Sequence, residues 1–101
     1  MKKDLCNTSR IGRHGRMRLE FIKQERQELY TQLLFSAGLE EYLIDINDRT
    51  KERIWDLTQQ IAHRQGITEE LKARDQMAWV RAMNAIKALA EEVIFHEMIY
   101  E

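Results

Sequence analysis

Residues that break regular structure are scarce along the whole chain. Its 101 residues include no proline, and its four glycines stand at positions 12, 15, 38 and 66. Proline and glycine most often end helices and form tight turns, so a turn-rich β-sandwich or a disordered linker protein fits poorly. The segments between the glycines are long enough for helices of several turns. We therefore expect an all-α protein.

The segment from Leu39 to about Gln65 has the clearest helical pattern. Apolar residues and one threonine recur in it at intervals of three and four, which places them on one side of a helix. Gly66 follows directly and is a suitable residue to end that helix. The stripe consists of Leu39, Leu43, Ile46, Thr50, Ile54, Leu57 and Ile61.

A second long helix is expected from Gln76 to about Tyr100, with Asp75 as its N-terminal cap. Each long helix would measure near 40 Å, at about 1.5 Å per residue. The connection between them is short and holds one further turn from Thr68 to Arg74, which favours an antiparallel hairpin. The apolar face of the second helix consists of Trp79, Met83, Ile86, Ala90, Val93 and Ile94.

The N-terminal part is expected to add two shorter helices. Residues 1–12 show no periodicity, which predicts a flexible basic tail. Residues 13–25 and 27–37 carry apolar side chains at helical spacing, and Gly38 is expected to end the second helix in the left-handed conformation. The prediction is a small helical bundle in one domain, residues 13–101. It is built on a long antiparallel helix hairpin that the short N-terminal helices cover.

Positive charge is concentrated near the N-terminus. Residues 1–26 carry a net charge of +5 and residues 27–101 a net charge of −6. A flexible arm of arginines could grip nucleic-acid phosphates, although no helix-turn-helix or zinc-finger pattern accompanies it. The alternative is that this basic arm lies on the acidic body of the protein. The arm consists of Arg10, Arg13, Arg16 and Arg18.

Negative charge forms a row on the helix that begins at Leu39. Its acids also recur at intervals of three and four, within an arc of roughly 80° opposite the apolar stripe. The row is about 22 Å long, and neighbouring acids are about 4.5–6 Å apart along the axis, a spacing like that of phosphates on a nucleic acid. It could therefore occupy a basic nucleic-acid groove, or it is a solvated helix face. The acidic face consists of Glu41, Asp45, Asp48, Glu52 and Asp56.

Further apolar residues lie off the two main stripes. A helix with two apolar faces needs two contacts. Packing beneath the N-terminal helices would supply the second contact. The alternative is a dimer or partner surface. The candidate contact residues are Ile44, Trp55, Phe95 and Ile99.

Enzyme, metal and membrane functions have little support in the sequence. The histidines at 14, 63 and 96 are scattered, Cys6 is the single cysteine, and no nucleophile, zinc or phosphate-loop motif is present. We expect no catalytic residue, metal or cofactor. No apolar run approaches about 18 residues and no signal peptide is evident, so we expect a cytoplasmic protein without a membrane contact.

Several stretches resemble the TnpV family of small transposon-encoded proteins. The most specific are Trp79-Val80-Arg81 with Met83-Asn84, and the C-terminal Glu97-Met98-Ile99-Tyr100. The resemblance implies a protein of bacterial mobile elements and brings no activity or catalytic residue to transfer. The other matching stretches are Gly15-Arg16 with Leu19, Leu29-Tyr30-Thr31-Gln32-Leu33-Leu34, Gly38-Leu39 with Tyr42-Leu43 and Asp45, Gly66-Ile67-Thr68-Glu69-Glu70-Leu71-Lys72, and Met77-Ala78.

Three functions are compatible with these observations. The first is a non-enzymatic accessory binding protein of the mobile element, which contacts DNA or the recombinase and modulates recombination or transfer. The second is an inhibitor of a host defence nuclease of the CRISPR–Cas type, whose acidic helix face occupies a guide-RNA or DNA groove. The third is a structural role that rests on self-assembly, for example as a homodimer.

Overall fold

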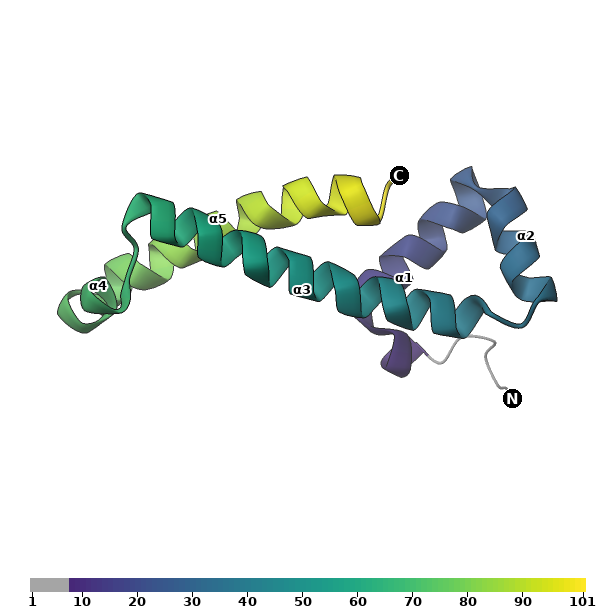
Figure 1. Cartoon of the computed structure of the whole chain (residues 1–101), viewed down its shortest axis with the longest axis horizontal. Coiled ribbons are helices and arrows are strands. Elements are labelled where there is room, and N and C mark those ends of the chain that lie inside the picture. The colour runs from purple at the N-terminus through teal and green to yellow at the C-terminus, as the bar shows by residue number, and fades with distance from the viewer. Residues whose placement is uncertain (1–7) are drawn as a thin grey trace.

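The computed structural model describes residues 8–101, which form five helices and no strand (Figure 1). This confirms the expected all-α helical bundle. The two long helices are α3 and α5, and the Asp75 side chain caps α5 by accepting a hydrogen bond from the Ala78 amide at 3.1 Å. The helices are α1 (Thr8–Glu25), α2 (Gln27–Phe35), α3 (Leu39–Gln65), α4 (Glu69–Arg74) and α5 (Gln76–Met98).

The 27-residue helix α3 runs along the long axis of a molecule that measures 54 × 27 × 16 Å. Helices α1 and α2 pack at its N-terminal end, and α5 returns antiparallel along its C-terminal end after the short α4 (Figure 1). The N-terminal helices therefore cover the part of α3 that α5 leaves open. The C-terminal end of α5 abuts α1, where Phe21 and Tyr100 meet edge to face at 5.7 Å between ring centroids.

Two apolar clusters form along α3. The first, between α1 and the N-terminal part of α3, consists of Ile11, Leu19, Ile22, Leu39 and Leu43. The second, between α3 and α5, consists of Ile54, Ala90 and Ile94. The predicted apolar stripe of α3 faces both clusters, because one continuous stripe can meet two successive neighbours along a helix of this length.

Helix α1 begins earlier than the sequence pattern indicated. It starts at Thr8 and is kinked at Gly12, and Ile11 is fully buried. The predicted flexible tail over residues 1–12 is therefore wrong for its last part, because one helical turn before the kink places Ile11 in the core. Residues 1–7 lie outside the described part of the chain, and so does Cys6.

The left-handed residue that follows α2 is Ala37 and not Gly38. Ala37 has φ 61°, whereas Gly38 has φ −104° and precedes α3. The Ala37 and Gly38 amides donate to the Leu34 and Leu33 carbonyls at 3.2 and 3.0 Å, which is the hydrogen-bond pattern of a Schellman motif. The prediction for Gly38 is wrong by one position, because helix α2 ends at Phe35 and the motif fixes the left-handed residue two positions later.

Ala37→Gly is expected to stabilise the protein by about 0.5–1 kcal/mol. A left-handed conformation costs a residue with a Cβ about 1–2 kcal/mol, and the glycine variant avoids this cost. The greater conformational freedom of glycine in the unfolded chain offsets part of the stabilisation. Urea denaturation measures the change. The matched control is Ala85→Gly in the exposed interior of α5, which should destabilise by about 1 kcal/mol. A change in the free energy of unfolding of the same sign in both variants would contradict the left-handed conformation of Ala37.

Candidate functional site

The five residues of the acidic face are all exposed on α3. They lie opposite the buried residues Leu43, Thr50 and Ile54, so neither α1 nor α5 covers them. Asp45 forms an intrahelical ion pair with Arg49 at 3.2 Å. Within residues 8–101, the other four carboxylates have no ion-pair partner.

The four arginines assigned to the basic arm lie within the bounds of helix α1. Arg13, Arg16 and Arg18 belong to α1, which is docked on α3, so they do not form a flexible arm. The side chain of Arg10 lies outside the described part of the structure. Arg13 faces α5, where its guanidinium lies 3.7 Å from Glu91 and 5.9 Å from the centre of the Phe95 ring. It therefore does not reach the acidic face of α3.

Arg18 is a structural residue. Its side chain is buried, Nε donates to the Tyr42 hydroxyl at 3.0 Å, and Nη1 donates to the Ile99 carbonyl at 2.8 Å. The guanidinium also lies over the rings of Phe21 and Tyr42, at 5.5 and 5.9 Å from their centres. The prediction that Arg18 contacts phosphate is wrong, because this side chain joins α1 and α3 to the carbonyl end of α5.

The four candidate apolar contacts divide into buried and exposed residues. Ile99 is fully buried, and Ile44 and Phe95 are partly buried against the two clusters. Ile99 packs where the end of α5 meets α1, which agrees with the packing interpretation and not with the alternative of a partner surface. Trp55 is 64% exposed and stands on α3 beside the acidic face. It is the one member of this set that a partner can reach.

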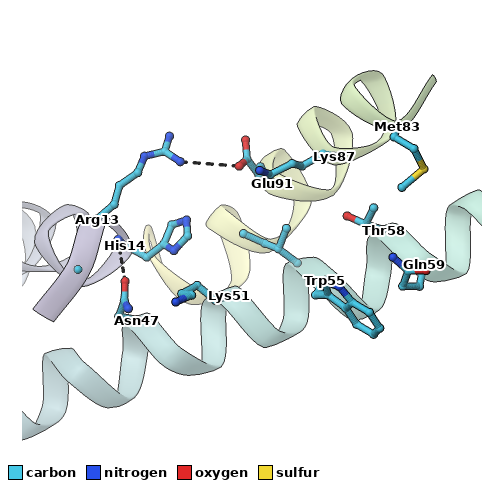
Figure 2. A pocket seen from close by; sticks show the side chains of 12 residues that line it. Arg13, His14, Asn47, Lys51, Trp55, Thr58, Gln59, Met83, Lys87 and Glu91 are labelled. Atoms are coloured by element: carbon cyan, nitrogen blue, oxygen red, sulfur yellow. Dashed lines mark hydrogen bonds and ion pairs between the residues drawn. The ribbon is translucent and has the colours of Figure 1, made fainter. Parts of the chain in front are cut away.

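A groove lies where α1, α3 and α5 meet, and the sequence pattern did not indicate it. Its volume is about 610 Å³. Figure 2 shows Arg13 and His14 of α1, Lys51 and Trp55 of α3, and Lys87 and Glu91 of α5 around it. These residues come from three helices that are distant in sequence, so no local spacing could have grouped them.

Asn47 of α3 shapes the α1 side of this groove. Its Oδ1 accepts hydrogen bonds from the amides of His14 and Gly15, at 3.0 and 3.2 Å (Figure 2 shows the first). After the kink at Gly12, these amides belong to the first turn of a helix segment, where backbone donors have no partner within the helix. Asn47 therefore caps α1 from a neighbouring helix. The only local signal was a polar residue within the apolar face of α3.

His14 is the most constrained titratable group at the groove. It is 9% exposed, its ring lies 5.5 Å from that of Phe95, and neither ring nitrogen has a hydrogen-bond partner. Burial, and secondarily the positive charge of Arg13, lower the pKa of His14 below its usual 6.5. The imidazole is therefore neutral near pH 7.

The described residues carry neither a metal centre nor a membrane helix. No group of three or more His, Cys, Asp or Glu side chains in residues 8–101 could hold a metal ion. In the same range, no helix is both long enough and apolar enough to cross a bilayer.

Comparison with known proteins gives one match. A family model described as transposon-encoded protein TnpV matches residues 3–99, nearly the whole chain. No curated protein and no solved structure matches it.

Proposed function

We propose that this chain, which belongs to the TnpV family of transposon-encoded proteins, is a non-enzymatic accessory binding protein that acts through the acidic face of α3. Its partner would be a basic protein of the mobile element, namely the recombinase. Binding would modulate recombination or transfer in the cytoplasm.

The exposed acidic face is the observation that carries this proposal. All five acids stay clear of α1 and α5, and they span 16 residues of α3, a length of about 22 Å. An exposed tryptophan beside the acids, Trp55, supplies the kind of aromatic anchor that protein interfaces favour. A recombinase must present a basic surface to its DNA, and such a surface complements a row of carboxylates.

Direct DNA binding through α1 has less support. Arg18 is committed to Tyr42 and Ile99, and Arg13 lies beside Glu91. Phosphate binding by the basic arm would need these side chains to leave existing partners. The acidic face needs no such rearrangement to meet a basic protein.

A second candidate function, inhibition of a host defence nuclease, is favoured by the spacing of the acidic face. Its carboxylates follow one another at about 4.5–6 Å along a rigid helix axis, close to the repeat of backbone phosphates. A CRISPR–Cas nuclease holds its nucleic acid in a positively charged channel. The same face would then displace guide RNA or DNA instead of binding a recombinase.

Charge reversal of the acidic face tests both functions. The triple variant Asp45→Lys, Asp48→Lys and Glu52→Lys is expected to weaken partner binding by about 100-fold or more, because attraction becomes repulsion at three contacts. Its far-ultraviolet circular dichroism should stay unchanged, since all three side chains are exposed. Binding is measured by pull-down from a bacterial lysate, with and without nuclease treatment, and then by calorimetry with the purified partner.

A control variant with the same change in net charge separates the effect of the acidic face from the effect of net charge alone. Reversal of the exposed acids Glu20, Glu25 and Glu92, which lie on α1 and α5, should leave binding within a few-fold of wild type. Retention of the element's recombinase after nuclease treatment supports the first function, and retention of a Cas-type nuclease supports the second. Recovery of DNA alone, or equal loss in both triple variants, would contradict a role for the acidic face.

A further inference from the structure

We propose that the groove between α1, α3 and α5 binds a nucleoside phosphate, with its phosphate at Lys51 and Lys87 and its base against Trp55. The groove's volume of about 610 Å³ is within the usual range of about 300–1,000 Å³ for small-molecule sites. The charged groups of this site differ from those of the acidic face, and Trp55 lies beside both. The ligand of this site is a nucleoside phosphate instead of a basic protein.

Charge is the first argument for an anion. Three of the charged groups that line the groove are cations, Arg13, Lys51 and Lys87, and Glu91 is the single acid. Glu91 forms an ion pair with Arg13, with 3.7 Å between Nη1 and Oε2. Lys51 and Lys87 project from facing helices and have no ion-pair partner within residues 8–101. The groove is thus locally positive on a chain whose net charge is −1.

A second part of the groove lining argues for a flat ring. Trp55 of α3 and Met83 of α5, both labelled in Figure 2, line the groove together with Ile54, and 64% of the surface of Trp55 is exposed. Stacking on an aromatic side chain stabilises a bound base and suits any base, because every base has a π face. A cationic part and an apolar aromatic part in one groove match a phosphate joined to a nucleobase. A bare inorganic anion would leave the aromatic part of the groove unoccupied.

His14 is the second, independent observation. Its ring is nine-tenths buried at the side of the groove, with two unpartnered nitrogens, an arrangement that is rare in folded proteins. The groups that face it are Arg13 from α1, Lys51 from α3, and Lys87 and Glu91 from α5. Three of these four are positive. A bound phosphate would offset them, so the buried imidazole would accept a proton more readily in the complex than in the free protein.

The affinity test uses the fluorescence of Trp55 in a Trp79→Phe background, which leaves one tryptophan. We expect saturable quenching by dTMP and by an oligothymidylate, and at least tenfold weaker binding by the double variant Lys51→Gln and Lys87→Gln, because two charge-assisted contacts are lost. The control, Lys23→Gln with Lys72→Gln, removes the same charge outside the groove and should bind as its parent does. A higher affinity for the oligomer assigns the site to single-stranded DNA, and an equal affinity assigns it to free nucleotide.

The proton test uses nuclear magnetic resonance of His14. Addition of dTMP should raise the pKa of His14, which burial and the charge of Arg13 lower in the free protein. By linkage, the His14 contribution to dTMP affinity then increases as the pH falls through the bound-state pKa. A His14→Gln variant keeps the phosphate's own titration and lacks this contribution. Absence of saturable quenching, equal binding by the lysine variant, equal affinity for inorganic phosphate, or an unmoved His14 pKa would each overturn the proposal.

Discussion

Gly12→Ala is expected to lower the free energy of unfolding by about 4 kcal/mol, since it adds backbone strain and displaces a buried cap. Gly12 has φ 85° and ψ 175°, a region that is essentially restricted to glycine. A Cβ at this position would lie 2.6 Å from both Nδ2 and Oδ1 of Asn47. The Asn47 side chain would have to move, and the amides of His14 and Gly15 would lose their buried acceptor.

A double-mutant cycle separates the two contributions. Asn47→Ala alone should cost about 2–3 kcal/mol, because two buried amides lose their acceptor. In that background the clash is absent, so Gly12→Ala should cost only its backbone strain of about 1–3 kcal/mol. Denaturant unfolding of the four proteins gives the coupling, which should exceed about 1 kcal/mol. Additive costs would show that Gly12 and Asn47 do not constrain each other.

Gly66→Ala is the matched control for backbone strain. Gly66 also has a positive φ, 75°, but a Cβ there would meet no atom within 4 Å. This substitution should therefore cost only the left-handed penalty of about 1–2 kcal/mol. A cost as large as that of Gly12→Ala would remove the steric part of the argument.

These two glycines also show which structural features a local sequence pattern can predict and which it cannot. The left-handed end of α3 at Gly66 and the cap at Asp75 were predictable, because both depend on neighbours within a few residues. The role of Gly12 depends on Asn47, and the hydrogen bonds of Asn47 span 32 and 33 residues. A helical periodicity describes neighbours within a few turns of one helix, so it cannot predict a contact between residues this far apart in the sequence.

The same distinction applies to the candidate sites. The acidic face was predictable from Glu41 to Asp56, because residues on one side of a single helix are set by local geometry. The groove was not, because Lys51 and Lys87 line one groove only after α5 packs on α3. The prediction for Arg18 failed because its partners Tyr42 and Ile99 are also distant in the sequence. The concentration of positive charge near the N-terminus grouped Arg18 with the basic arm, although its neighbours Leu19 and Ile22 are core residues. A charged residue close in sequence to two apolar core residues indicates that its own side chain is buried.

Arg18→Met is expected to lower the free energy of unfolding by about 3 kcal/mol. The variant keeps an unbranched apolar stem, and it loses two hydrogen bonds from a charged group, each worth about 1.5–3 kcal/mol after dehydration is included. It also leaves the Ile99 carbonyl, where Nη1 now donates at 2.8 Å, without that donor. Because this carbonyl ends α5, the loss should also appear locally. Hydrogen exchange should become faster over residues 95–101 than over the middle of α3.

Two further variants show whether the hydrogen bonds or the charge hold α5 in place. Arg18→Lys keeps the charge but cannot reproduce the two directions of the guanidinium, so its cost should be intermediate, about 1.5–2 kcal/mol. Arg13→Met removes an arginine of the same helix whose side chain is 61% exposed, and should cost less than about 1 kcal/mol. Equal costs of Arg18→Met and Arg13→Met would show that the buried guanidinium adds little stability. The contact between α1 and the C-terminal end of α5 would then depend on the burial of Ile99 and on the ring contact of Phe21 with Tyr100. If Arg18→Lys matched wild type, positive charge at the carbonyl end of α5 would suffice, and the Tyr42 hydroxyl would contribute little.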